Sequence, residues 1–183
     1  MLRDDQCDAL LDILTCVIKR LVEIFDKVEI HSVRGNHDGT DHYPVMLALK
    51  NYFKPYEKIN FHIHSARTAV FKIEKTLIML DHGASDEYAF DVPKAGKPRE
   101  SYIQSLFLGR PEDLIGVNQK LFIQGDKHHY EQIEYNDFEF IMLGALPLGD
   151  QYADHGNMHS RARQNCFVID ENGLKSVLHY YVK

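Results

Sequence analysis

The sequence predicts an α/β fold in which one long helix is followed by many strands and few further helices. Three observations lead to this prediction. An amphipathic stretch opens the chain, apolar runs of strand length follow it, and several of these runs end in Gly, His, Asp or Asn. Such a mixture of helical and strand patterns in one chain is typical of a sheet covered by helices.

Length and composition indicate one globular domain over residues 1–183, with 44% hydrophobic and 26% charged residues. The net charge of -6 argues against a generally basic nucleic-acid-binding surface. Cys7, Cys16 and Cys166 are odd in number and lack the spacing of metal ligands, so we expect reduced thiols in a cytoplasmic protein. No apolar run is long enough to span a membrane, and we expect no membrane partner.

The first element is a predicted helix over residues 4–26. Its apolar side chains recur at spacings of four and three and form one stripe, made of Leu10, Leu14, Val17, Leu21 and Ile24. A coiled coil is the alternative, but the stripe is too short for it. We therefore expect this helix to pack on a sheet.

Three predicted strands, over 28–33, 76–81 and 120–124, each end in a polar cluster. These clusters are Gly35-Asn36-His37-Asp38, His82-Gly83 and Gly125-Asp126-Lys127-His128. Open α/β sheets keep ligand sites at the carboxyl ends of their strands. The first cluster alone is better interpreted as an ordinary polar loop, whereas three such strand ends favour one site along one edge of a sheet.

The other predicted elements are helices over 44–53 and 100–108, a strand over 59–65, a hairpin over 67–73 and 76–81, strands over 130–135 and 138–143, and a hairpin over 167–170 and 174–182. His62 and His64 share one face of their strand. An exposed face of an edge strand is the favoured interpretation of this pair, and metal ligation is the alternative. Arg161 and Arg163 fall in a long loop, 146–164, and are candidates to hold a substrate phosphate.

In this order, the three polar clusters resemble motifs of the calcineurin-like metallophosphoesterase superfamily, most nearly its DNA-repair exonucleases and their phage relatives. Gly35 to Asp38 match the third motif, His82-Gly83 the fourth, and Gly125 to His128 the fifth, with Asp126 where the family usually has His. The first two motifs, Asp-x-His and Gly-Asp-x-x-Asp, do not precede Gly35. The resemblance covers nearly the whole chain. It implies a partial four-layer sandwich, two mixed β-sheets flanked by helices, without the family's N-terminal strands.

The resemblance also implies a metal site and its residues. One divalent ion would be held by Asn36, His82 and Asp126, and His128 would help to hold a second. His37 would be the catalytic histidine, which assists the phosphate and the leaving group, and Asp38 would orient it. Imidazole together with oxygen ligands suits manganese, zinc or iron, and manganese is the metal we expect. Two ions roughly 3.5–4 Å apart can polarise a phosphodiester and activate water.

Three interpretations of the missing motifs remain. The favoured one is a metal-dependent phosphodiesterase or nuclease acting on DNA, present as the C-terminal part of its catalytic domain and completed by a separately encoded N-terminal segment or by a homo-oligomer. The second is a degenerate binding module that holds one metal or none and hydrolyses nothing on its own. The third has Asp4, Asp5 and Asp8 replace the missing carboxylates, although the helix stripe already explains that stretch.

Overall fold

The computed structural model describes residues 3–36, 40–83, 99–145 and 161–181. The chain divides into two compact units, Met1–Ala69 and Val70–Lys183. Both contain helices packed on strands, so the predicted α/β class with flanking helices is confirmed. Among the described residues, no helix has the length and apolar character needed to cross a membrane. The single domain expected from the sequence stays a prediction.

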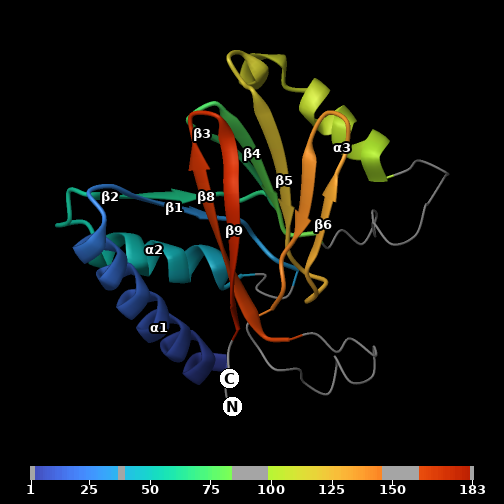
Figure 1. Cartoon of the computed structure of the whole chain (residues 1–183). Helices are drawn as coiled ribbons and strands as arrows, with labels where there is room; N and C mark the ends of the chain where they lie inside the picture. The colour runs from blue at the N-terminus through green and yellow to red at the C-terminus, as the bar shows by residue number, and fades with distance from the viewer. Residues whose placement is uncertain (1–2, 37–39, 84–98, 146–160, 182–183) are drawn as a thin grey trace, which may run out of the picture. The chain divides into compact units, whose positions relative to one another are not determined.

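The first unit is a pair of parallel strands covered on one face by two helices (Figure 1). Its elements are α1 (Arg3–Ile24), β1 (Val28–Ser32), α2 (His42–Tyr52) and β2 (Ile59–Ile63). Leu49 of α2 and Ile18 of α1 are buried against Val28 and Ile59 of the strands. Because side chains alternate along a strand, the residues between these apolar positions stand on the opposite face of the pair.

The second unit is built on a mixed five-stranded sheet with the order β3-β4-β5-β7-β6. These strands are β3 (Thr68–Ile73), which crosses the boundary between the units, β4 (Thr76–Asp81), β5 (Gln119–Gln124), β6 (Glu131–Glu134) and β7 (Glu139–Met142). β5 is parallel to both β4 and β7, whereas β6 is antiparallel to β7. The carboxyl ends of β4 and β5 therefore meet at one edge of the sheet.

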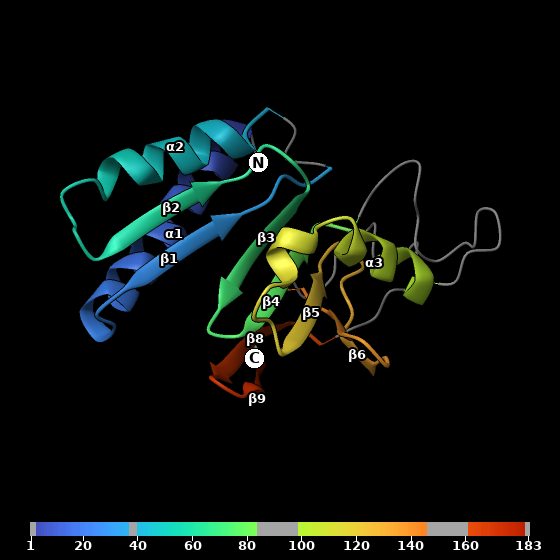
Figure 2. The ribbon, with the colours of Figure 1, turned by 90° about the horizontal axis from the view of Figure 1, so that it is seen from above.

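The two faces of this sheet have different covers, as Figure 2 shows. One face packs against α3 (Arg99–Leu108) through Ile103 and Phe107, which are buried with Phe122 of β5. The other face packs against the antiparallel hairpin of β8 (Arg163–Asp170) and β9 (Gly173–Tyr181). A 3-10 helix, Pro111–Leu114, follows α3. Because both faces are covered, the three consecutive apolar residues at the centre of β5, Leu121 to Ile123, are all buried.

One predicted boundary was wrong in a way that affects a site residue. The sequence places Arg163 in a loop over 146–164, but β8 begins at Arg163, which lies opposite Tyr181 of β9. The backbone N–H of Arg163 also donates to the carbonyl of Ala145 at 2.8 Å. This pairing comes from residues distant in sequence, which local composition does not reveal. Residues 146–160 of the predicted loop lie outside the described residues.

Candidate metal centres

The edge where β4 and β5 end brings together two of the sequence-predicted ligands. Asp81 and Gln124 are partners in the parallel register, and the N–H of Gly125 donates to the carbonyl of Asp81 at 3.2 Å. His82 follows the first strand directly, and Asp126 follows the second after Gly125. Because β4 and β5 end at paired residues, the side chains that follow them lie next to each other.

His82 and Asp126 approach each other closely in this unit. Nε2 of His82 lies 3.6 Å from Oδ1 of Asp126, and the two side chains are 24% and 16% exposed. The other carboxylate oxygen, Oδ2, lies 3.6 Å from Nζ of Lys127. Asp126 thus sits between an imidazole and an ammonium group, in a half-buried position that solvent still reaches.

The loop after β5 has an unusual backbone. Asp126 has φ 70° and His128 has φ 58°, the left-handed region that residues with a Cβ seldom adopt. Each such position costs of order 1–3 kcal/mol and persists only where surrounding contacts impose it. One contact within the loop is a hydrogen bond from Nδ1 of His129 to the carbonyl of Lys127, at 3.0 Å. Backbone strain of this kind is common in ligand-binding loops.

A buried carboxamide lies beside this loop. The side chain of Gln124 is fully buried, and neither Nε2 nor Oε1 has a hydrogen-bond partner among the described residues. It lies against Gly83, where a Cβ would meet Nε2 of Gln124 at only 2.4 Å. Buried polar groups without partners are rare and call for a ligand or water. The edge therefore offers polar atoms beyond His82 and Asp126.

The positions of His82 and Asp126 fit a divalent metal ion. Bonds of roughly 2.0–2.2 Å from imidazole nitrogen and carboxylate oxygen to one ion bring the two ligand atoms to within about 3–4 Å of each other, and the observed separation is 3.6 Å. The mixed nitrogen and oxygen donor set suits manganese, zinc or iron. His82 and Asp126 would hold the ion.

The remaining predicted site residues lie elsewhere or outside the described part. Asn36 follows β1 and is exposed, and it belongs to the first unit, so its place beside His82 stays a prediction. His37 and Asp38 lie outside the described residues. His128 is exposed, two residues after Asp126, and its role as a ligand also stays a prediction.

The two arginines predicted to bind phosphate stack on tyrosines. Arg161 lies over the ring of Tyr181 at 5.7 Å, and Arg163 lies over the same ring at 5.3 Å and over Tyr130 at 4.9 Å. Such cation–π contacts leave guanidinium N–H groups able to bind an anion at the same time. Their predicted role is compatible with these positions and is not tested by them.

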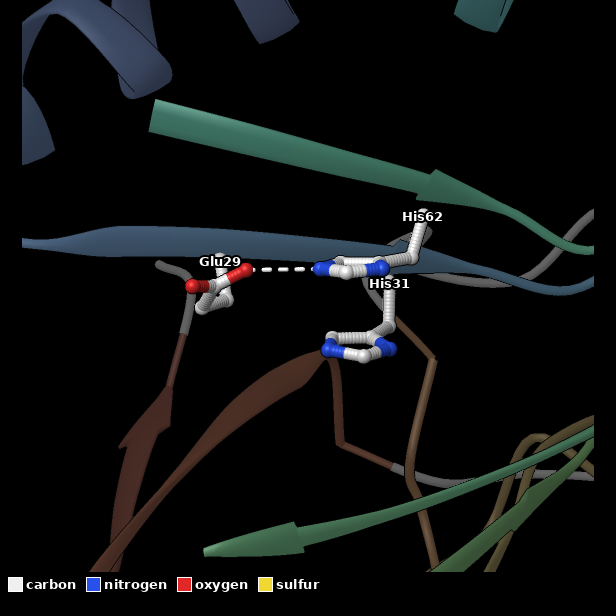
Figure 3. A group of neighbouring side chains, drawn as sticks. All are labelled: Glu29, His31 and His62. Atoms are coloured by element: carbon white, nitrogen blue, oxygen red, sulfur yellow. Dashed lines mark hydrogen bonds and ion pairs between the residues drawn. The ribbon is translucent and has the colours of Figure 1, made fainter. Parts of the chain in front are cut away.

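A second group of possible metal ligands lies on the open face of β1 and β2, which here means the face opposite α1 and α2 within the first unit. It consists of Glu29, His31 and His62, whose nearest ligand atoms all lie within 4.8 Å of one another (Figure 3). Oε2 of Glu29 accepts a hydrogen bond from Nε2 of His62 at 2.6 Å. The rings of His31 and His62 stack with centroids 4.3 Å apart and planes 10° apart.

Electrostatics hold this group in a form that metals bind. Hydrogen bonds from Lys27, and then from His62 and Asn60, lower the pKa of Glu29 to about 2. Burial, followed by the nearby His62 and His64, lowers the pKa of His31 to about 4. Near neutral pH, Glu29 is therefore a carboxylate and His31 a neutral imidazole, as metal ligation requires.

Glu29 and His31 were not predicted from the sequence as possible ligands. They alternate with apolar Val28 and Ile30 and so share a face, which is a visible signal. What the sequence does not show is the parallel register that sets His31 opposite His62. Of the pair His62 and His64, for which an exposed face was the favoured interpretation, His62 is exposed and His64 is half-buried. His62 also contacts Glu29 and His31.

Comparisons with known proteins found similar solved structures only. No family model matches the chain, and no curated protein matches it. A single mutant of Vps29 from Entamoeba histolytica is 16% identical, with coverage of 91% of this chain and 89% of that chain and a TM-score of 0.45. The wild-type Vps29 of the same organism, complexed with zinc, is 18% identical, with 91% and 87% coverage and a TM-score of 0.44.

A conserved uncharacterised protein from Streptococcus pneumoniae TIGR4, described as a predicted phosphoesterase, is also similar. It is 16% identical, with coverage of 93% of this chain and 82% of that chain and a TM-score of 0.49. Identities and TM-scores this low do not establish a function for this chain.

Proposed function

We propose that this chain is a metal-dependent phosphoesterase, with its reaction centre at the carboxyl ends of β4 and β5. The observation that carries the proposal is the 3.6 Å approach of His82 Nε2 to Asp126 Oδ1 at that edge. These residues lie in two of the three motifs that resemble metallophosphoesterases. A paired imidazole and carboxylate at one sheet edge is a donor set for a divalent ion.

In this proposal, the site residues have three tasks: metal binding, proton transfer and phosphate binding. His82 and Asp126 hold the ion, together with Asn36, and His128 helps to hold a second one. A bound divalent ion polarises a phosphate ester and lowers the pKa of water for attack. His37 donates a proton to the leaving oxygen, and Asp38 orients its ring. Arg161 and Arg163 bind phosphate oxygens.

The substrate we propose is a phosphodiester, with DNA favoured through the resemblance to repair exonucleases, and the metal is manganese. The net charge of -6 opposes the approach of a phosphate backbone. Productive binding of DNA then depends on the local positive charge of the bound ion.

The test is hydrolysis of a chromogenic phosphodiester by the full chain in the presence of manganese. We expect activity that His82→Ala or His37→Ala lowers by at least about 100-fold, since removal of a single electrostatic or acid–base group costs roughly 10²–10³. His179→Ala, an exposed histidine of β9, is the matched control and should keep full activity. Measurable hydrolysis that is equal in all variants would contradict the proposed centre.

A binding module without hydrolase activity is the second candidate, because no Asp-x-His or Gly-Asp-x-x-Asp precedes Gly35. It predicts no hydrolysis by this chain under manganese excess. A separately encoded N-terminal segment that carries the missing motifs, or a homo-oligomer, would restore hydrolysis only if the first proposal holds. Addition of that segment therefore separates the two candidates.

A further inference from the structure

We propose that Glu29, His31 and His62 form a second, separate divalent metal site of zinc type on the open face of β1 and β2. None of these residues lies in the motifs that define the centre at β4 and β5. Their ligand atoms lie within 4.8 Å of one another in the first unit alone. Two imidazoles and one carboxylate form a ligand set of catalytic zinc sites, which leave a fourth position open.

The backbone fixes this set on one face. Val28 and Ile59 are buried under the helices at the start of the parallel pair. The alternation of strand side chains then sends Glu29, His31 and His62 to the other face. Because His31 and His62 are partners in the register, the two rings start from adjacent backbone positions on rigid elements, which favours a defined site.

In the metal-free state, Glu29 and His62 are joined by a hydrogen bond that a bound ion would replace. Glu29 is ionised, so Nε2 of His62 must donate the 2.6 Å hydrogen bond to its Oε2. An ion that enters between these atoms needs the lone pair of Nε2, so the proton of the neutral His62 ring moves to its other nitrogen, Nδ1. Ligand atoms around a tetrahedral ion lie roughly 3.3–3.6 Å apart for bonds of about 2.0–2.2 Å. Rotation of His31 and Glu29 about their side-chain bonds supplies the contraction from 4.8 Å.

His64 is a positioning residue for this site. Its Nε2 lies 3.4 Å from Nδ1 of His31, and the two rings are nearly parallel, with centroids 5.6 Å apart. A metal-ligating histidine is usually held at its other nitrogen by such a neighbour. His64→Ala should therefore weaken binding by about 10–100-fold without removing a ligand.

An ion can reach the site from solvent. His62 and Glu29 are exposed. His62 also lines a cavity of about 470 Å³ that includes Asn60, Lys50 and Lys54. Lys27, 2.7 Å from Oε1 of Glu29, is itself 72% exposed and can move aside. The site therefore needs no opening of the core.

The test is zinc binding by the full chain, with zinc alone as the probe and a chromophoric chelator as competitor. The background is the double variant His82→Ala, Asp126→Ala, which removes the other proposed centre. We expect this background to bind about one zinc per chain. Cobalt in place of zinc should give the visible absorption of a four-coordinate site.

In that background, Glu29→Gln and His62→Gln should each weaken zinc binding by at least about 10–100-fold, the loss known for supporting residues alone. His62→Gln keeps an N–H donor for Glu29, so the fold is retained, which circular dichroism verifies. His179→Ala should bind as the background does. A background that binds no zinc, or Gln variants that bind as tightly as the background, would overturn this site. Neither result depends on whether the chain hydrolyses phosphodiesters.

Discussion

Gly83 shows how a single residue shapes the edge where β4 ends. Its φ is +101°, and its backbone N–H donates to Oδ1 of Asp81 at 2.7 Å. A Cβ at this position would meet Nε2 and Cγ of Gln124 at 2.4 and 2.8 Å. Since Gln124 is fully buried, it has little room to move. The sequence motif His-Gly is thus required by packing as well as by any chemistry.

We predict that Gly83→Ala destabilises the chain more than Gly116→Ala does. Gly116 has a comparable positive φ, +73°, but nothing lies within 4 Å of a Cβ placed there. Gly116→Ala should cost about 1–2 kcal/mol of unfolding free energy from backbone strain alone. Gly83→Ala adds a steric clash worth roughly 1–3 kcal/mol. Urea denaturation measures both, and equal losses would show that Gln124 yields without cost.

The lowered pKa of His31 should make the stability of the metal-free chain depend on pH. Burial first, and the nearby His62 and His64 next, lower its pKa from 6.5 to about 4. Between these values the unfolded chain binds a proton that the folded chain does not, so stability falls as the pH drops from 6.5 towards 4. The direction for His64 is the same.

His31→Gln should remove part of this dependence. The check is the free energy of unfolding in the presence of a chelator at several pH values across that range, with His179→Gln as the control. Titration of the His31 ring by NMR should give a midpoint near 4. A midpoint near the ordinary histidine value would contradict the burial that the structure shows.

At the scale of elements, α3 is held to the sheet by one face. Phe107 is 1% exposed and its ring lies 5.8 Å from that of Phe138, whereas its neighbour Leu108 is 72% exposed. Phe107→Ala should destabilise the chain by about 3–5 kcal/mol through the cavity it leaves. Leu108→Ala, the matched control on the same helix, should change stability by less than about 0.5 kcal/mol. Thermal unfolding compares them, and similar losses would mean that α3 packs through its other face.

Most elements were predictable because their signal is local. The opening helix, expected over 4–26, is observed as Arg3–Ile24, and the strand expected over 120–124 is observed as Gln119–Gln124. The first has an apolar periodicity and the second a short apolar run. The stripe predicted for the helix was wrong in part, because Leu10, Val17 and Ile24 are exposed. The helix packs instead through Leu11, Leu14, Ile18 and Leu21. The start of β8 at Arg163 was not predictable, because it depends on pairing with Tyr181, eighteen positions away in sequence.

Of the two candidate metal sites, one could be predicted from the sequence and the other could not. His82 and Asp126 could be predicted as neighbours because each follows a strand end, and parallel strands meet at one edge. The Glu29, His31 and His62 group could not, because a parallel register over more than thirty residues leaves no trace in either strand alone. Alternation identifies the face of each strand but does not identify its partner.

At the scale of the whole molecule, the chain has a separate apolar core in each unit. The first core includes Leu49 of α2 and Val28 of β1, and the cores on the two faces of the larger sheet include Leu121 and Phe122 of β5. Every residue in each of these clusters comes from one unit. Cooperative unfolding units in proteins often coincide with such local cores.

We therefore predict that damage to one core loosens mainly its own unit. Leu49 and Leu121 are both fully buried, and replacement of either by Ala should cost about 2–5 kcal/mol. In hydrogen exchange, Leu49→Ala should lower amide protection in α1, α2 and β1 and leave β5 protected, whereas Leu121→Ala should do the reverse. This pair is its own control, since the same chemical change is made at equal burial. If either variant lowered protection equally in both units, the chain would unfold as one cooperative body, and a metal bound at β1 and β2 would then stabilise β4 and β5 as well.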